Sequence, residues 1–394
     1  MKNIAVKGFK AAGISAGLKK SGHKDLGMIF SQHPANVAGL FTKNLVQAAP
    51  VLLDKERITS GVCQAIIANS GNANCCTGDQ GISDARAMAK LAASELEISE
   101  ELVLVASTGV IGEPLPIKKI GRAISGLVNS LASEGINDFA QAIMTTDTIP
   151  KKAFRKIELE GNSFTVSGIA KGAGMIRPDM ATMLCFVCTD AEISTEILKT
   201  TLIEAANRSF NRITIDGDTS TNDTILILAN GLSEAIIHDA EHQHIFQEVL
   251  NEILLDLAKQ LVSDGEGVTK LVEVIVQGAM SDSDALKIGD TIANSPLVKT
   301  AFFGEDANWG RIVAAAGRAG AVIYPDKIDI YFDDVQMVKN GMGCGRNAEK
   351  SATRVLKKPE FTVTIDFNCG DGSASILTCD FSLEYVKVNA DYRS

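Results

Sequence analysis

The sequence predicts a mixed α/β fold in which strands occur both as antiparallel pairs and between helices. Segments with helical spacing of apolar residues alternate with short strand-like runs, and one pair of runs is joined by an Asn-containing turn. No Pro/Gly/Ser-rich linker, low-complexity tract or short repeat divides the 394 residues. We therefore expect one compact unit or two interlocked halves.

The first half of the chain predicts three helices followed by three strands. Helical spacing begins at Ser83, Lys118 and Ile136, and a capping pattern marks the first of these starts. The segment FRKIELEGNSFTVSGIA, from Phe154, predicts two short strands in a hairpin. The apolar run TMLCFVCTDA, from Thr182, predicts a buried strand.

The second half predicts long helices over 192–211 and 241–262, then a strand in KLVEVIVQGA. NWGRIVAAAGRAG predicts a helix whose small residues suit close packing. Three late segments are expected to be strands: IDIYFDDVQMV, FTVTIDFNCG and SASILTCDFSLEYVKV.

The overall charge argues against nucleic acid as a partner. The formal net charge is −10 and the sequence pI is near 5.1, so a polyanion would meet a repulsive average field. The first twenty residues lack the apolar region of a secretory signal, and no apolar run has the length of a membrane span. We expect a cytoplasmic protein with no membrane partner.

The eight cysteines are expected to be reduced thiols, because the chain is large and shows no secretory signal. Cys185 and Cys188 form a lone C-x-x-C within a predicted strand, where positions three apart point to opposite faces. No second pair at zinc-ligand spacing accompanies them. A structural role is therefore favoured over a metal or redox role.

Histidine is scarce, and this constrains the catalytic chemistry. His238 and His242 could share a helix face and bind a metal, but with His244 they lie in a polar segment that favours a solvated helix end. The other two histidines are His23 and His33. These patterns favour no metal site, and a catalytic base other than histidine is expected.

The most unusual segment is KGAGMIRPDMATM, over 171–183, which joins two predicted strands. An ordinary loop or a phosphate-binding glycine loop would explain its composition, although neither the Walker A nor the G-x-G-x-x-G spacing is present. A third explanation starts from Thr182, whose hydroxyl needs a base to act as a nucleophile. Cleavage before Thr182 would free an α-amine, with an ordinary pKa of about 7.7 to 8.0, to serve as that base.

Further distinctive segments are spread over nearly the whole chain. They are DLGMIFSQHPANVAGLFTKN, IANSGNANCCTG, ASTGVIGEPLP, TTDT, SFNRITIDGDTSTNDT, DGEGVTK, SPLVKTAFFGEDANWGRI and YVKVNADYRS. In this order, with KGAGMIRPDMATM, they resemble the ornithine/glutamate N-acetyltransferase family, whose members cleave themselves at an Ala-Thr bond in such a motif.

The resemblance implies cleavage between Ala181 and Thr182. The products would be an alpha chain, 1–181, and a beta chain, 182–394, interlocked in one compact unit. Thr182 would be the nucleophile, and Thr108 with Gly109 would form the oxyanion hole. A hydroxyl and a backbone N–H are suitable donors where negative charge develops during acyl transfer.

The resemblance also implies substrate contacts from Thr182 itself and from Thr148, Lys171, Glu266, Asn389 and Ser394. Lys171 could pair with the carboxylate of an amino-acid substrate, and Glu266 with the cationic side chain of N-acetylornithine. Without the family, both would be expected as solvated surface charges. The family usually ends in Thr where this chain has Ser394, and both residues carry a hydroxyl.

Family members have a layered α/β sandwich with facing sheets flanked by helices, N-terminal-nucleophile processing and (αβ)₂ heterotetramers. The implied reaction moves acetyl from N-acetylornithine to Thr182 and then to glutamate, without a cofactor. Some relatives also accept acetyl from acetyl-CoA, and the sequence leaves that choice open.

Two rival functions remain at the level of sequence. A self-cleaving aminopeptidase or amidase of related architecture would use water as the acceptor. An acidic binding protein that holds an anion in its glycine-rich loop would remain a single chain of 41.7 kDa.

Overall fold

The computed structural model describes residues 5–177 and 183–391. The chain forms two compact units, one of Met1–Asn211 with Asp218–Leu261, the other of Arg212–Gly217 with Val262–Ser394. The boundary near 261 does not coincide with position 182. No helix in the described ranges is both long and apolar enough to cross a membrane.

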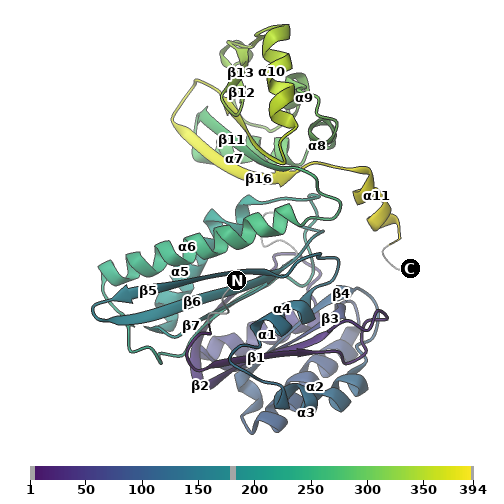
Figure 1. Ribbon diagram of the computed structural model, residues 1–394, viewed down its shortest axis with the longest axis vertical. Helices are drawn as coiled ribbons and strands as arrows, with labels where there is room; N and C mark the ends of the chain where they lie inside the picture. Colours follow the sequence, from purple (N-terminus) through teal and green to yellow (C-terminus); the bar gives the residue numbers. More distant parts are fainter. Residues whose placement is uncertain (1–4, 178–182, 392–394) are drawn as a thin grey trace. The chain divides into compact units, whose positions relative to one another are not determined.

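An eight-stranded sheet organises the first unit, in the order β4-β3-β2-β9-β7-β6-β5, with β1 paired to β2 (Figure 1). Its strands are β1 (Phe9–Ile14), β2 (Leu26–Phe41), β3 (Val62–Asn72), β4 (Val103–Val110), β5 (Lys151–Leu159), β6 (Asn162–Lys171), β7 (Leu184–Thr189) and β9 (Thr224–Ala229). A separate parallel pair consists of β8 (Glu192–Ile193) and β10 (Ile236–Ile237).

The long strand β2 belongs to both halves of this sheet. Its start pairs with β1 and β3, and after an irregularity between Phe30 and Ala35 its end pairs with β9. Buried residues from both halves and from α4 (Ile136–Ile143) form one core cluster. Within it, Phe139 on α4 and Phe186 on β7 meet edge to face, with ring centroids 5.4 Å apart. The two halves therefore belong to one mixed sheet and share this core.

Helices cover the outer faces of both halves (Figure 1). The helices α1 (Ala49–Arg57), α2 (Gly78–Leu96) and α3 (Ile117–Asn129) share a second core cluster with β1–β4. The helix α6 (Ala240–Ser263) packs on β6, where a Cβ at Gly168 would lie 2.9 Å from side-chain atoms of Ile253 and Leu257. The result is the predicted layered arrangement of mixed sheets flanked by helices.

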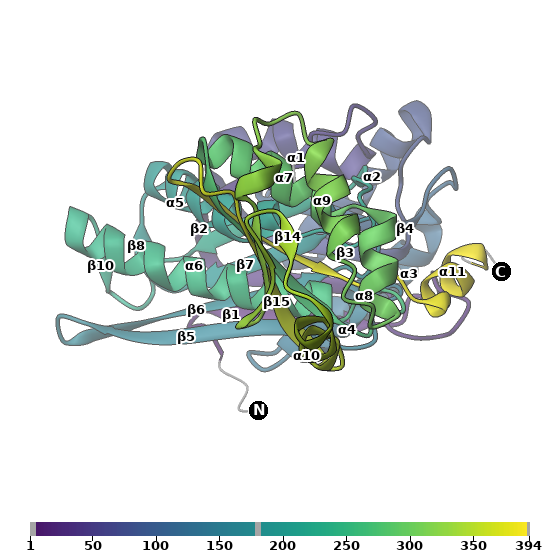
Figure 2. The same cartoon turned by 90° about the horizontal axis from the view of Figure 1, so that it is seen from above.

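The strands on either side of position 182 are interleaved in the first unit. β6 ends at Lys171, β7 begins at Leu184, and these two residues are partners in an antiparallel pair. β7 and β9, which follow position 182, lie between β6 and β2, which precede it. Figure 2 shows this region from a second direction, with β5 and β6 side by side along their length.

The second unit contains a six-stranded sheet in the order β14-β13-β12-β15-β11-β16. β11 and β15 are parallel, and the other neighbours are antiparallel. Its elements are β11 (Leu271–Ala279), α7 (Asp282–Ala293), α8 (Pro296–Phe303), α9 (Trp309–Gly317), β12 (Asp329–Phe332), β13 (Val335–Lys339), β14 (Met342–Gly343), α10 (Arg346–Leu356), β15 (Glu360–Asp366), β16 (Gly372–Cys379) and α11 (Leu383–Ala390). Buried residues of the sheet and of α7–α10 share one core cluster.

Four sequence predictions need correction. The helix predicted to begin with a cap at Ser83 begins earlier, because α2 starts at Gly78 and Ser83 lies inside it. The helix predicted over 192–211 is shorter: α5 (Thr195–Arg208) begins after β8, because the Ser194 hydroxyl accepts from Ile197 N and caps it. The run IDIYFDDVQMV is a hairpin of β12 and β13, with Asp333 at φ 48° in its turn. The last predicted strand ends at Cys379, and Ser382 then caps α11 by accepting from Glu384 N and Tyr385 N.

Candidate active site

Lys171, at the end of β6, joins three separate segments of the first unit. Its side chain is buried, and Nζ donates to Thr108 Oγ1 at 3.2 Å and to Thr145 Oγ1 at 3.0 Å. Thr108 lies near the end of β4, and Thr145 follows α4. From its residue type alone, Lys171 was expected to be a solvated surface charge. In the structure it is buried instead.

Gly109 follows Thr108 at a place where two strands approach closely. Its φ is 133°, and a Cβ there would lie 2.4 Å from Gly71 C and 2.5 Å from Asn72 N. Both the backbone angle and the space therefore require glycine. The oxyanion-hole pair expected from the sequence lies beside the backbone of β3, with Thr108 bonded to Lys171.

Asp147 is a buried carboxylate that organises the same region. Its Oδ1 accepts from Lys151 Nζ at 2.5 Å and from Gly172 N at 2.7 Å, and its Oδ2 accepts from Thr145 N at 2.9 Å. Burial alone would raise the pKa of Asp147, but the charges of Lys171 and Lys151 lower it to about 2. Asp147 is therefore ionised near neutral pH and supplies negative charge beside two buried lysines.

A cavity of about 600 Å³ opens beside these residues in the first unit, large enough for an amino-acid substrate. Thr145, Asp147 and the exposed Thr148 line one wall, and Lys19 and His23 belong to another. Lys19 Nζ donates to the carbonyl oxygens of Lys24 and Met144, at 2.8 and 2.7 Å. Burial, with help from the charge of Lys171, lowers the pKa of Lys19 to about 8.

The loop before β9 connects strand β4 to Met183, the residue that follows position 182. Asn222 Nδ2 donates to Ser107 O at 2.8 Å and to Ala73 O at 2.7 Å. The next residue, Asp223, accepts from Met183 N at 2.9 Å through Oδ1. These two adjacent side chains fix the start of β7 relative to the end of β4.

Sequence analysis did not single out Asp147, Asn222 or Asp223, whose side chains join distant segments of this region. All three lie in segments that carried the family resemblance, TTDT and DGDTSTNDT, but no role was attached to them. Their partners are up to 149 residues away along the chain, so no local pattern revealed them.

The remaining predicted site residues lie elsewhere. Ala181, Thr182 and Ser394 fall outside the described residues. Glu266 and Asn389 both belong to the second unit, where Asn389 Nδ2 donates to Glu266 Oε2 at 2.8 Å. Glu266 is buried, so this carboxylate is not the solvated surface charge that its residue type would suggest.

The histidine segment is only partly solvated. His238 is exposed, but His242, in the first turn of α6, is buried and its Nδ1 contacts Ile236 O at 3.1 Å. One ligand atom each from His238, Asp239 and His242 lie within 4.8 Å of one another. The expectation of a solvated helix end is therefore wrong for His242, because the first turn of α6 packs against the residues around β10.

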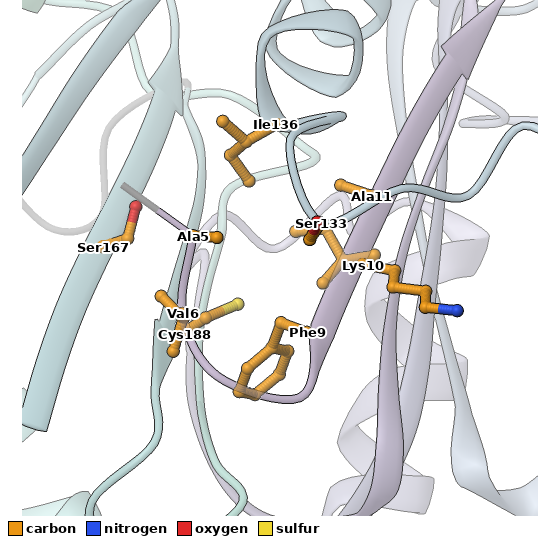
Figure 3. A pocket seen from close by; sticks show the side chains of 10 residues that line it. Ala5, Val6, Phe9, Lys10, Ala11, Ser133, Ile136, Ser167 and Cys188 are labelled. Atoms are coloured by element: carbon orange, nitrogen blue, oxygen red, sulfur yellow. The ribbon is translucent and has the colours of Figure 1, made fainter. Parts of the chain in front are cut away.

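The two C-x-x-C cysteines are buried in β7, and burial raises the pKa of both thiols. Cys188 also lines a small apolar pocket of about 20 Å³ (Figure 3). In Figure 3, Val6, Phe9 and Cys188 lie close together there. This pocket has room for about one water molecule and none for an amino-acid substrate.

Comparisons with known proteins identify the chain. Residues 10–394 match the model of the ArgJ family. A protein named arginine biosynthesis bifunctional protein ArgJ, from Geobacter sulfurreducens, is 53% identical over 391 residues, which is 99% of this chain and 100% of that protein. Its namesake from Syntrophotalea carbinolica is 52% identical over 393 residues, again 99% of this chain and 100% of the relative.

A solved structure described as ornithine acetyltransferase complexed with ornithine, from Mycobacterium tuberculosis, is 39% identical. The match covers 44% of this chain and 93% of that chain, with a TM-score of 0.40. The sequence comparisons define the molecule as an acetyl-transferring enzyme of arginine biosynthesis. The chain belongs to the ArgJ family, and the family expected from the sequence motifs is confirmed.

Proposed function

We propose that the first unit transfers acetyl from N-acetylornithine to glutamate through an acetyl ester on Thr182. The reaction releases ornithine and N-acetylglutamate. The hydrogen bond from Lys171 Nζ to Thr108 Oγ1 is the observation that carries the proposal. This bond connects Lys171, the first residue of the segment that contains Thr182, to Thr108, whose hydroxyl is expected to stabilise the oxyanion.

The direction of that hydrogen bond suits Thr108 for its proposed role. A lysine ammonium has donors and no acceptor, so the Thr108 oxygen is the acceptor. The hydroxyl hydrogen of Thr108 is then available to donate to a substrate carbonyl oxygen that becomes negative. Together with the Gly109 N–H it would supply two donors, the arrangement that stabilises a tetrahedral intermediate.

The transfer takes two steps that use the same hydroxyl. Thr182 Oγ attacks the acetyl carbonyl of N-acetylornithine, the C–N bond breaks, and ornithine leaves with a proton on its nitrogen. The neutral amine of glutamate then attacks the ester carbon, and Thr182 recovers its proton as N-acetylglutamate departs. The α-amine freed at Thr182 would carry the proton within each step. In the first it would pass the hydroxyl proton to the departing ornithine nitrogen, and in the second it would pass a proton from the glutamate nitrogen to Thr182 Oγ.

Substrate contacts are assigned by charge and position. Lys171 would pair with the carboxylate that every substrate and product carries, and Thr148 lies on the wall of the neighbouring cavity. Glu266, Asn389 and Ser394 would contact the rest of the amino acid. The hydrogen bond between Asn389 and Glu266 supports a common role for these two residues.

We further propose that the mature enzyme consists of chains 1–181 and 182–394, assembled as an (αβ)₂ heterotetramer in the cytoplasm. Interleaving of β7 and β9 with β2 and β6 supports chains that stay together after cleavage. A denaturing gel should show two fragments, and native mass spectrometry should show a particle of four chains. A native mass equal to one alpha and one beta chain would contradict the tetramer.

The test of the transfer compares two incubations of purified enzyme with N-acetylornithine. With glutamate, equal amounts of ornithine and N-acetylglutamate are expected by mass spectrometry. An aminopeptidase or amidase would instead release acetate at the same rate without glutamate. Acetyl-CoA is proposed as a second donor because the relatives carry the name bifunctional, and N-acetylglutamate formed from acetyl-CoA alone would support it.

A further inference from the structure

Two histidines and an aspartate meet at the start of α6, outside the candidate active site. His238, Asp239 and His242 follow β10 with the spacing H-D-x-x-H. One ligand atom from each of the three side chains lies within 4.8 Å of the other two. The imidazole rings of the two histidines meet edge to face, with centroids 5.3 Å apart. The proposed acetyl transfer uses none of these residues, so it does not account for the cluster.

The two oxygens of the Asp239 carboxylate have different partners. Oδ1 accepts from His242 N at 2.9 Å, and the backbone oxygen of Asp239 accepts from Gln243 N at 2.9 Å, so Asp239 caps the first turn of α6. Oδ2 lies 3.6 Å from His238 Nε2 and 3.5 Å from His242 Nδ1. The helix cap therefore holds the second carboxylate oxygen close to two imidazole nitrogens.

These spacings match the ligand sphere of a zinc ion. Zinc binds imidazole nitrogen and carboxylate oxygen at about 2.0–2.2 Å, so neighbouring ligands in a tetrahedral site lie about 3.3–3.6 Å apart. The distances of 3.5 and 3.6 Å from Asp239 Oδ2 to the two histidines lie at the upper end of that range. Calcium and magnesium prefer sets of oxygen ligands, whereas two imidazoles with one carboxylate suit zinc.

The surroundings of His242 suit a metal ligand. Only 5% of the residue is exposed, so packing restricts its imidazole ring. Nδ1 faces Asp239, and Nε2 lies 3.6 Å from Oε1 of Glu160, in the turn between β5 and β6. A ligand histidine usually donates its second ring N–H to a carboxylate or a carbonyl, which fixes the ring. The exposed side chain of Glu160 has the freedom to close this hydrogen bond.

The backbone oxygen of Ile236 faces both histidines. It lies 3.5 Å from His238 Nδ1, and a proton on that nitrogen leaves His238 Nε2 bare to bind an ion. It also lies 3.1 Å from His242 Nδ1. A carbonyl oxygen only accepts, so His242 Nδ1 carries a proton in that contact. When an ion binds to His242 Nδ1, the ring proton is therefore carried on Nε2, on the side of Glu160.

We propose that His238 Nε2, Asp239 Oδ2 and His242 Nδ1 form a structural zinc site, with one water molecule as the fourth ligand. The three ligands come from the link between β10 and α6, and Glu160 lies beside them in the hairpin turn (Figure 2). The unfolded chain does not hold these atoms together, so a bound ion stabilises the folded first unit. The sequence pattern favoured no metal site because it showed neither the burial of His242 nor the orientation of Asp239.

The main test is isothermal titration calorimetry of untagged full-length protein after treatment with a chelator and desalting. Zinc chloride should bind at one equivalent per chain, and magnesium chloride should give no binding heat. His238→Gln and Asp239→Asn should each weaken zinc binding by about 100-fold or more, since loss of an outer partner of a ligand already costs about 10–100-fold. Asp239→Asn keeps a side-chain oxygen for the helix cap, so this loss is separate from any unfolding of α6.

His244 offers a matched control. It is exposed, lies on α6 two residues after His242, and is not a member of the cluster. His244→Gln should bind zinc with the wild-type affinity. No stoichiometric binding to the wild type, or equal zinc affinity in the wild type, His238→Gln and Asp239→Asn, would overturn the proposal.

Cobalt distinguishes this site from zinc bound to cysteine, of which the chain has eight. Cobalt(II) chloride should give the visible bands of a tetrahedral ion without the intense near-ultraviolet band of thiolate ligation. These visible bands should disappear in His238→Gln. A thiolate band that persists in His238→Gln would mean an adventitious ion only, held by cysteines, and would overturn the proposal.

Thermal unfolding measures the structural role and separates it from acetyl transfer. Free zinc at about 100 times its Kd increases the ratio of folded to unfolded protein by about 100-fold. The Tm should therefore rise with zinc in the wild type and in His244→Gln, and stay constant in Asp239→Asn. Without zinc, Asp239→Asn should transfer acetyl from N-acetylornithine to glutamate at the wild-type rate. An equal rise of Tm in Asp239→Asn, or zinc-dependent transfer that this variant loses, would contradict a structural site.

Discussion

Lys171 and Thr108 are 63 residues apart in the sequence, and the Lys171 ammonium donates to the Thr108 hydroxyl at 3.2 Å. The contact exists because β6 and β4 end at the same region of the first unit, next to the Thr145–Thr148 segment. The two residues share this hydrogen bond but have different proposed roles, which kinetic experiments can separate. Lys171 would act on substrate binding, and Thr108 would act on the transition state.

Replacing Thr108 by alanine should slow turnover without weakening substrate binding. The loss of one oxyanion donor lowers kcat by about 10²–10³-fold. Steady-state kinetics with N-acetylornithine should show that decrease with a KM close to the wild-type value. Thr108→Ser, which keeps the hydroxyl, is the control and should retain most activity. A large rise in KM at constant kcat would make Thr108 a binding residue instead.

Replacing Thr182 by alanine should remove both self-cleavage and acetyl transfer, because both are proposed to use one hydroxyl. The purified variant should run as a single band at 41.7 kDa on a denaturing gel and form no N-acetylglutamate. Thr182→Ser should retain partial cleavage. An alanine variant that still yields two fragments places the cut at another bond.

Asp147 should contribute to stability in a pH-dependent way. Its pKa is about 2 in the folded protein against an ordinary 3.8, so the ionised form is favoured by folding. The ionised carboxylate therefore adds about 2 kcal/mol to the free energy of unfolding at pH values above its ordinary pKa. This contribution is lost as pH falls from about 4 towards 2. Calorimetry of Asp147→Asn should show a lower Tm at pH 7, and the gap from wild type should narrow in acid.

The larger part of the Asp147→Asn effect is expected from its buried partner. Asp147 and Lys151 are both fully buried, and removing one member of such a pair costs about 3–5 kcal/mol. The double variant Asp147→Asn with Lys151→Met removes the unpaired charge and should recover stability. A Tm gap that is constant from pH 7 to pH 2 would show that Asp147 has no ionised role.

Acetylation of Thr182 should accelerate as pH rises through the pKa of its α-amine, because only the neutral amine accepts a proton. That pKa is about 7.7 to 8.0 when unperturbed. Rapid-quench measurement of acetyl-Thr182 formation from N-acetylornithine isolates this step, since the substrate has no free α-amine. Glutamate is absent, so its own amine does not contribute.

Two residues of the cavity wall are the controls for that titration. The pKa of Lys19 is lowered to about 8, in the same range, and His23 lines the same cavity. Lys19→Met and His23→Gln should both leave the acetylation curve in place. A curve that disappears in either variant would transfer the base role to that residue.

Local patterns predicted the elements whose faces differ in polarity. The helices at Lys118 and Ile136 and the strand β5 agree with the structure, and each has a buried and an exposed side. The second strand of the predicted hairpin, β6, also forms but is mostly buried. In contrast, β3 is almost entirely buried and has no alternation, so it was not predicted. The strand expected at the C-terminus included the residues of α11, because the cap at Ser382 lies inside the segment SASILTCDFSLEYVKV that was interpreted as one strand.

Lys171 and Thr108 could be named as candidates only through the family resemblance, because the residue type of Lys171 alone predicts a solvated surface charge. Asp147 and Asp223 could not be singled out from the sequence, because their burial and their hydrogen-bond partners depend on how the sheet brings distant segments together. The insertion of β7 and β9 between β2 and β6 is a tertiary feature that no single segment encodes.

The insertion of β7 and β9 favours synthesis of the protein as one chain that is cleaved afterwards. If the two chains were synthesised separately, β2 and β6 would each lack the neighbour that completes the sheet, and unpaired strand edges promote aggregation. In a single chain the same strands find each other at high effective concentration. A cut at Ala181–Thr182 made after folding would leave these four strands paired. Each product chain would then hold two of the four central strands and depend on the other chain for their neighbours.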